Sequence, residues 1–295
     1  MISISSLINR LPGGIAQGLI WGIMALGVYI TFRVLKESDL TVDGSFATGG
    51  ATTVMLLQAG VNPFVSLLVA FFAGTVAGIT TGLIHTKLKI PAILSGILVQ
   101  LALFPINLHI MNMAANVAIN LDKTNLLISI RKVPLTILVC GILTIVLIAV
   151  MYWYFGTEQG CALRATGNSN HMALAQGINI DTMKIIGFGL GNGLVGLAGG
   201  ILSQYQGYAD INMGRGAIVI GLAAIIIGEA LSEVVFKKGC SFYMRLAFVI
   251  AGGIIYYAAM ILILWLRIDS NDLKLFTALI VMIFLAIPNF KKGRN

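Results

Sequence analysis

Residues 185–208 read IIGFGLGNGLVGLAGGILSQYQGY, and this stretch contains no charged side chain. A helix of about 20 apolar residues crosses the hydrocarbon core of a bilayer, so the stretch is long enough to span a membrane. Glycines at 187, 189, 191, 193, 196, 199 and 200 remove the side chains from much of its surface. Membrane helices approach closely where such small residues face a neighbour. The stretch therefore predicts a spanning helix packed tightly inside a bundle.

The composition of the whole chain agrees with this interpretation. Of the 295 residues 58% are apolar and 10% are charged, and the mean hydropathy is +0.96. Soluble domains carry about 25% charged residues, so the chain is predicted to be a polytopic membrane protein. The net charge of +8 is dispersed between apolar runs, which argues against nucleic-acid binding. The three cysteines stand singly and suggest neither a disulfide framework nor a metal site.

Eight apolar runs are predicted to span the membrane: 13–32, 64–84, 90–110, 134–155, 185–208, 216–236, 246–266 and 275–290. Pro91 and Pro105 predict that the third run starts late as a helix and breaks near its end. Residues 44–59 begin with GSFATGGATT, which predicts a short, broken or re-entrant helix packed against protein. The expected fold is an all-α membrane bundle, one domain over residues 1–295. The first run is expected to be retained, because MISISSLINR lacks the features of a cleaved signal.

Lysine and arginine predict the orientation, since short basic loops stay in the cytoplasm. The cytoplasmic segments predicted in this way contain Lys87 and Lys89; Arg164 and Lys184; Lys237, Lys238 and Arg245; and Lys291, Lys292 and Arg294. Residues 33–43 and 122–132 mix both signs of charge and are assigned to the opposite side. A full crossing by residues 44–59 conflicts with this assignment. A re-entrant segment there removes the conflict and leaves the N-terminus inside.

Two short segments resemble each other. DLTVDGS (39–45) follows one long apolar run and DINMGRG (210–216) follows another, and each opens a run rich in glycine and alanine. Transporters are often built from repeats with the solute path between them. The sequence suggests an internal duplication and equally allows two loops that are similar by chance.

No catalytic arrangement is found in the sequence. The histidines stand on separate segments, at His85, His109 and His171, and no HExxH or GxSxG motif is present. Residues 191–196 match the letters of the dinucleotide fingerprint GxGxxG, but no strand precedes them, so helix packing is favoured. A Walker A sequence is absent, so this chain is not expected to hydrolyse ATP. An intramembrane enzyme is therefore the weakest hypothesis.

Ion-coupled carriers usually hold ionisable groups deep in the membrane. The candidates in this chain lie toward the ends of the apolar runs: Asp43, Arg215, Glu229 and Glu233. Capping, interface anchoring and partner contact are the favoured roles at such positions. An ion-coupled carrier remains as an alternative.

Residues 156–184 form a polar interruption on the basic side. Asn168 or Ser169 is predicted to cap a short helix from Asn170 toward Gln176, and Gly177 to end it in the left-handed conformation. A helix of about two turns is unstable alone in water, so a neighbouring protein is expected to receive it.

These residues carry a resemblance to a known family. GCALRATGNSNHMALAQGI (160–178) resembles the cytoplasmic coupling loop of bacterial ABC-importer permeases of the branched-chain amino acid and ribose type. GLIWGIMALGVYITFRVLKESDLTVDGSFATGGA (18–51) is similar to the subgroup described as tryptophan or tyrosine permeases. KLKIPAILSGIL (87–98) and INLHIMNMAANV (106–117) fit the same subgroup.

The resemblance implies a permease in the bacterial cell membrane that works with partners. Two permease copies would face one another around a path, two ATPase subunits would bind ATP and Mg²⁺, and an extracytoplasmic binding protein would deliver the solute. This chain would need no cofactor of its own. Coupling to the ATPase is assigned to Leu163, Arg164, Ala165, Gly167, Asn168, Ala173, Ala175 and Gly177. Arg164 is expected to pair with an acidic rim on the ATPase.

The solute path is predicted from polar residues in apolar runs: Ser45, Thr48, Thr52, Thr53, Asn192 and Gln204. Each of these side chains has an alternative role, which is to satisfy the backbone of a neighbouring helix. The expected solute is small and polar. An aromatic or branched-chain amino acid is favoured, and a nucleoside or a sugar is the alternative.

Overall fold

The computed structural model describes residues 4–120, 126–236 and 241–265, and the single positions 275, 279 and 282. The longer helices are α1 (Ile4–Tyr29), α2 (Val42–Gln58), α3 (Pro63–Lys87), α4 (Ala92–Ile110), α5 (Val133–Gly156), α8 (Ile180–Gln206), α9 (Ala217–Val235) and α10 (Phe242–Trp265). Two short helices, α6 (Glu158–Asn168) and α7 (Asn170–Ala175), separate α5 from α8. A π-helical turn, Ile30–Val34, extends α1, and a 3₁₀ turn, Ile130–Lys132, precedes α5.

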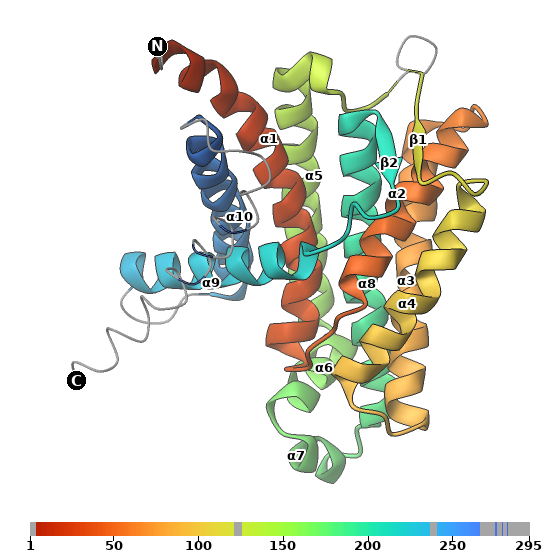
Figure 1. Ribbon diagram of the computed structural model, residues 1–295. Coiled ribbons are helices and arrows are strands. Elements are labelled where there is room, and N and C mark those ends of the chain that lie inside the picture. Colours follow the sequence, from red (N-terminus) through yellow and green to blue (C-terminus); the bar gives the residue numbers. More distant parts are fainter. Residues whose placement is uncertain are drawn as a thin grey trace.

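Within these ranges, seven helices are long and apolar enough to cross a membrane: α1 with its π-helical turn, α3, α4, α5, α8, α9 and α10. The predicted all-α membrane bundle is confirmed. Figure 1 shows α1, α3, α4, α5 and α8 running side by side. The eighth predicted span, 275–290, lies outside the described residues apart from the three single positions.

The glycine-rich helix α8 lies at the centre of the bundle, where α3, α2 and α1 pack against it. A Cβ atom added to Gly196 would lie 2.6 Å from the carbonyl oxygen of Ala70 on α3. A Cβ atom on Gly78 of α3 would lie 2.7 Å from the carbonyl carbon of Phe188 on α8. Because only a hydrogen fits at these positions, the two backbones are in direct contact. The GxGxxG letters at 191–196 lie within this helix and serve its packing.

Helix α2 is buried against protein along most of its length, as residues 44–59 predicted. It is one continuous helix of 17 residues, so of the predicted alternatives the short helix is confirmed and the broken helix is not. The hydroxyls of Thr48 and Thr52 are satisfied within the helix, since each donates to a carbonyl of the preceding turn. Helix α4 starts after Pro91, as predicted, but it continues through Pro105 to Ile110 without a break.

The loop between α1 and α2, residues 35–41, is called the connector here. It lies at the same end of the bundle as α6 and α7, whereas α1 begins at the other end (Figure 1). The assignment of residues 33–43 to the side opposite Arg164 is therefore wrong. Helix α1 begins at the end opposite α6 and runs toward α6, which is the reverse of the predicted direction. With this direction, a full crossing by α2 still allows α3 to end near α6, so the position of Lys87 and Lys89 requires no re-entrant segment. Arg131 and Lys132 lie at the far end, as predicted, because α5 starts there and ends at α6.

At the end of the bundle opposite α6, two short strands pair antiparallel: β1 (Asn116–Ala118) and β2 (Tyr208–Asp210), with Asn116 opposite Asp210. From β2 the chain descends to α9, which lies across the direction of α1 and α5 (Figure 1). The Asp43 carboxylate on α2 accepts hydrogen bonds from the amides of Gly216 (2.9 Å) and Ile218 (3.0 Å) and so caps α9. This agrees with the capping role favoured for Asp43.

The two segments that resemble each other have similar local structure. Asp39 accepts a hydrogen bond from the amide of Thr41, and Asp210 accepts one from the amide of Asn212, so each aspartate forms an Asx turn before a helix. The first segment follows a helix that ends near α6, and the second follows a helix that ends at the opposite side. This is the arrangement expected of an inverted repeat. The duplication itself stays a prediction.

Candidate functional site

The segment between α5 and α8 contains the short helix that its sequence predicts. The Ser169 hydroxyl caps α7 by accepting a hydrogen bond from the Met172 amide at 3.4 Å, and Gly177 follows with φ of +77°. The predicted short helix is therefore confirmed at Asn170–Ala175. The helix before it, α6, was not predicted. Its signal was Thr157, whose hydroxyl accepts a hydrogen bond from the Gly160 amide.

The predicted coupling residues divide into anchors and exposed positions. Leu163 and Ala173 are buried and hold α6 and α7 to the bundle. Arg164, Asn168, Ala175 and Gly177 are exposed, and Ala165 and Gly167 are half-buried. The most exposed apolar side chains of α7 are Met172 (65%) and Leu174 (59%). They give the tip of the segment an apolar face that the described residues do not cover.

The connector lies directly against α6. A Cβ atom on Gly167 would lie 2.8 Å from the carbonyl carbon of Val34 and 2.9 Å from the Cα atom of Leu35, so α6 touches the backbone at the end of α1. One residue later, the Lys36 ammonium donates a hydrogen bond to the Asn168 side-chain oxygen at 3.2 Å. The connector is therefore one of the segments that contact α6, together with α5 and α8.

The connector is bound to α8 and α3 by a charged cluster. The Lys184 ammonium lies 2.5 Å from the Glu37 carboxylate and 3.1 Å from Nε2 of His85, and all three side chains are mostly buried. The other ring nitrogen of His85 lies 2.7 Å from the carbonyl oxygen of Ile90. These contacts make His85 a structural residue at the joint between the connector, α3 and α8.

A second, fully buried network follows two residues later. The Asp39 carboxylate accepts hydrogen bonds from Nδ2 of Asn192 at 2.6 Å and from the amide of Thr41 at 2.9 Å. The Ser45 hydroxyl donates to Oδ1 of the same asparagine at 2.7 Å. Burial raises the pKa of the Asp39 carboxyl, and the bonds from Thr41 and Asn192 oppose that rise. Two predicted path residues, Ser45 and Asn192, are therefore joined to the connector through Asp39.

The other predicted path residues are packed between helices in this conformation. Thr48 and Thr52 bond to their own helix, as noted above. The Gln204 amide donates to the carbonyl of Pro63 at 3.0 Å. Thr53 is buried, and its hydroxyl has no hydrogen-bond partner among the described residues. Only Gln204 takes the alternative role left open by the sequence, a bond to the backbone of a neighbouring helix, and the assignment of these residues to the solute path stays a prediction.

A cavity of about 290 Å³ lies beside α2 with both polar and apolar side chains in its lining, and sequence reasoning missed it. Gln100 and Asn107 of α4 line it together with Asp43, Gly44 and Arg215. Gln100 and Asn107 were visible as polar interruptions of the run 90–110. Within a membrane helix such side chains usually face the bundle interior or a water-filled path. This cavity is therefore the better candidate for the solute path.

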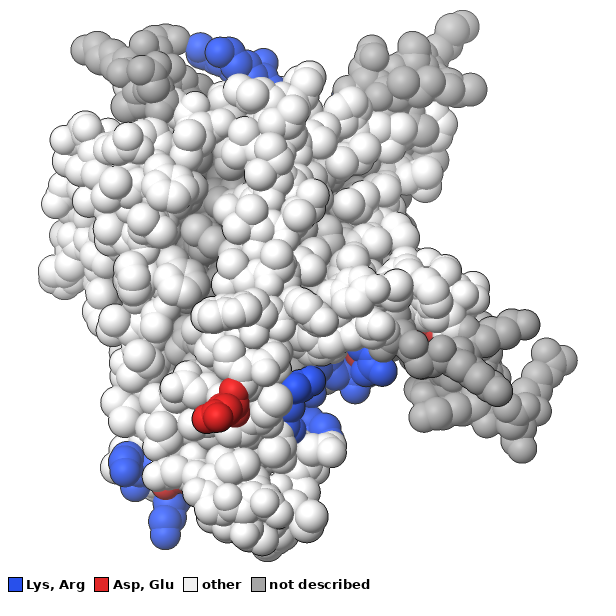
Figure 2. Space-filling model, turned by 180° about the vertical axis from the view of Figure 1, so that it is seen from behind, with Lys and Arg blue, Asp and Glu red and all other residues white. Residues whose placement is uncertain are grey.

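Apolar surface separates the charged ends of the molecule. Figure 2 shows basic and acidic side chains near the lower end, basic side chains at the upper end, and uncharged surface between them. Within the described part of the chain, no group of three or more His, Cys, Asp and Glu residues is placed to hold a metal ion. The fold and these surfaces define a multi-pass membrane protein, with the short helices α6 and α7 at one end and a cavity between α2 and α4.

Comparison with known proteins identifies the family. The family model for the branched-chain amino acid transport system permease component matches residues 11–286, and the chain belongs to this family of ABC-type permeases of the inner membrane. A tyrosine transport system permease protein of Clostridioides difficile (strain R20291) is 38% identical over 276 residues, which cover 92% of this chain and 89% of that protein. The resemblance stated from the sequence is confirmed.

More distant relatives extend the comparison. An uncharacterized protein of Rickettsia prowazekii (strain Madrid E) is 30% identical over 283 residues, covering 94% of this chain and 97% of that protein. The autoinducer 2 import system permease protein of Yersinia pestis (strain Pestoides F) is 28% identical over 193 residues, covering 63% of this chain and 52% of that protein. No solved structure matches the chain.

Proposed function

We propose that this chain is the permease subunit of an ATP-driven importer and that α6 and α7 receive a cytoplasmic ATPase subunit. The observation that carries the proposal is the unbroken series of contacts from α6 through the connector to Asn192. Gly167 touches Leu35, Lys36 bonds to Asn168, Glu37 holds Lys184, and Asp39 holds Asn192. Motion of α6 can reach α8 through these contacts, and α6 also packs directly against α8 and α5.

The exposed face of α7 supports the docking role. A six-residue helix is too short to be stable alone, and Met172 and Leu174 expose most of their apolar surface to water. Burial of such side chains in a partner gives about 1.5–3 kcal/mol each. On this proposal the end of the bundle with α6, Lys87 and Lys184 faces the cytoplasm. ATP and Mg²⁺ bind to the partner, and this chain carries no cofactor.

The proposed solute is an amino acid, and an aromatic one is favoured because the Clostridioides difficile relative is described as a tyrosine permease. A binding protein outside the membrane would deliver it, and a second permease copy would complete the path. A nucleoside or a sugar stays the alternative solute, and the autoinducer 2 import permease among the relatives supports keeping a solute other than an amino acid open. In either case, the cavity with Gln100 and Asn107 would make weak contacts with the solute.

The test is uptake of labelled tyrosine into proteoliposomes that contain this chain, its co-purified ATPase and the binding protein. The proposal expects uptake that needs ATP and stops when the ATPase is omitted. Competition by unlabelled leucine, adenosine and ribose then ranks the solute classes. Uptake by this chain alone, driven by a proton or sodium gradient, would instead establish an ion-coupled carrier.

A further inference from the structure

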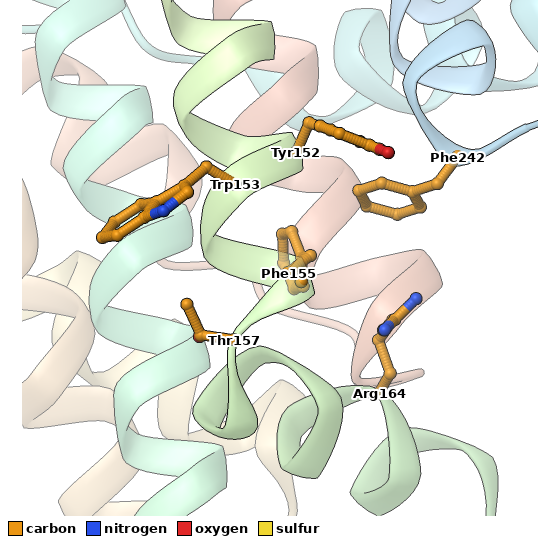
Figure 3. Close-up of a pocket in the computed structure, with 7 residues that line it drawn as sticks. Tyr152, Trp153, Phe155, Thr157, Arg164 and Phe242 are labelled. Atoms are coloured by element: carbon orange, nitrogen blue, oxygen red, sulfur yellow. The ribbon is translucent and has the colours of Figure 1, made fainter.

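Two hollows lie at the end of α5, beside α6 and the start of α10. The first, here the aromatic hollow, has a volume of about 460 Å³ and is lined by Tyr152, Trp153, Phe155, Arg164 and Phe242 among others. Figure 3 shows the Arg164 side chain rising from α6 toward Phe242 and Phe155. The guanidinium carbon lies 6.0 Å from the centre of the Phe242 ring. Arg164 is therefore directed along the bundle wall, toward α10.

The second, here the basic hollow, adjoins the first and shares Arg164 and Phe242 with it. Its volume is about 410 Å³, and four cationic side chains line it: Arg33, Lys36, Arg164 and Arg245. Arg33 is paired with Glu229. Lys36, Arg164 and Arg245 make no ion pair with a carboxylate within the described part of the chain. Figure 2 shows basic side chains gathered in a recess at this end of the molecule. The hollow has an excess of positive charge and fits an anion.

The aromatic side chains place these hollows at the level of the lipid headgroups. Trp153 is 69% exposed and Tyr152 is 57% exposed, on the outer surface of a spanning helix. Tyr152 packs edge to face with Tyr243 at 5.8 Å, and Phe155 packs with Phe242 at 5.1 Å. Tryptophan and tyrosine concentrate where the hydrocarbon core meets the headgroups. An anion that binds here is therefore at the depth of a phosphate group.

An apolar groove adjoins the aromatic hollow at Trp153 and Phe155, and it lies on the side of α5 that faces α3 and α8, where Figure 3 shows Trp153 pointing. Its volume is about 350 Å³, and it lies between α3, α5 and α8, with Phe71, Leu147, Met151 and Leu190 in its wall. Trp153 and Phe155 line both this groove and the aromatic hollow. All of its lining side chains are aliphatic or aromatic. A groove of this kind at membrane depth fits an acyl chain.

We propose that the end of α5 binds one anionic phospholipid, with its phosphate between Arg164 and Arg245 and an acyl chain in the apolar groove. Charge complementarity and the depth of the aromatic side chains favour this occupant over a soluble anion. The lipid joins α6, through Arg164, to α10, through Arg245. It thereby holds the coupling helix against the bundle wall.

The test is native mass spectrometry of the full-length chain in detergent, titrated with phosphatidylglycerol or with phosphatidylcholine of the same acyl chains. The wild type is expected to retain phosphatidylglycerol preferentially. Each of Arg164→Gln and Arg245→Gln should weaken that preference about fivefold, whereas Arg164→Lys should largely keep it. Lys87→Gln is the matched control, since it removes an exposed charge at the same end but outside the hollows. Equal retention of the two lipids by the wild type, or the same loss in the control, overturns the proposal.

Two further measurements separate the lipid from other anions and test the groove. Phosphatidylglycerol with brominated chains should quench tryptophan fluorescence in the wild type more than in Trp153→Phe. Equal quenching in both contradicts an acyl chain beside Trp153. Displacement of the lipid by millimolar inorganic phosphate would show a soluble-anion site. If Arg164→Gln and Arg245→Gln bind lipid normally but lose a co-purifying ATPase, the hollow belongs to a protein contact, and the lipid proposal is wrong.

Discussion

Gly167 offers the sharpest perturbation of the proposed coupling route. In Gly167→Ala the new Cβ would lie 2.8 Å from the carbonyl carbon of Val34 and 2.9 Å from the Cα atom of Leu35. Ordinary contacts between carbon atoms are about 3.5–4.0 Å, so α6 must move away from the connector by about 1 Å. Overpacking of this kind costs about 1–3 kcal/mol. The Lys36–Asn168 hydrogen bond, which spans 3.2 Å, would be lost with the same movement.

The assay compares solute uptake with ATP hydrolysis in the reconstituted importer. A coupling free energy of about 1–3 kcal/mol corresponds to about 5–150-fold, so uptake per ATP should fall at least about fivefold while the ATPase stays active. The matched control is Gly156→Ala at the end of α5, where an added Cβ meets no atom within 4 Å. It should transport like the wild type. Normal uptake per ATP in Gly167→Ala, at normal protein levels, would refute the route through the connector.

Three other predictions follow from the buried polar contacts. Asp43→Ala removes the cap of α9 and should lower the free energy of unfolding by about 1 kcal/mol, measured by thermal denaturation in detergent, with Asp43→Asn losing less. Asn192→Asp places a second carboxyl beside Asp39, where Asn192 now donates a hydrogen bond at 2.6 Å, and this raises the pKa of the Asp39 carboxyl further. The variant should therefore be most stable at low pH and lose stability as pH rises through that raised folded pKa, while a flat profile would contradict the contact. Gln100→Leu and Asn107→Leu should each raise the KM for uptake, and an unchanged KM in both would remove the cavity from the path.

Much of the fold follows from local patterns in the sequence. Charge-free runs locate the spanning helices, and Ser169 with Gly177 locates α7, because caps and left-handed glycines act within a few residues. The glycines of α8 predict a central helix for a similarly direct reason, since a helix without side chains gains contacts only from protein.

The position of the connector was not predictable from charge counts. Residues 33–43 contain nearly equal numbers of basic and acidic side chains, among them Arg33, Lys36 and Glu37. The count of basic residues therefore does not indicate on which side of the membrane this segment lies. The partners of Arg33 and Glu37 are Glu229 and Lys184, which are about 150 residues or more away in the chain. Ion pairs between such distant residues exist only in the folded bundle.

The residues that line a cavity were also not predictable from the sequence alone. A polar side chain in an apolar run either faces a cavity or bonds to a helix backbone, and the composition is the same in both cases. Thr48 and Thr52 take the second role, whereas Gln100 and Asn107, on a helix that contained prolines, line the cavity. The choice depends on which face of each helix its neighbours cover.

The central claim is that a separate ATPase moves this permease through α7. The most direct measurement is the ATP hydrolysis that co-purifies with the tagged full-length chain from its native membrane. The double variant Met172→Asp with Leu174→Asp should lose most of that activity, because both exposed side chains would no longer be apolar. Met113→Asp, at a position 67% exposed on the other end of the bundle, should keep it. Equal activity in the α7 variant and the control, or no ATPase with the wild type, would contradict the account.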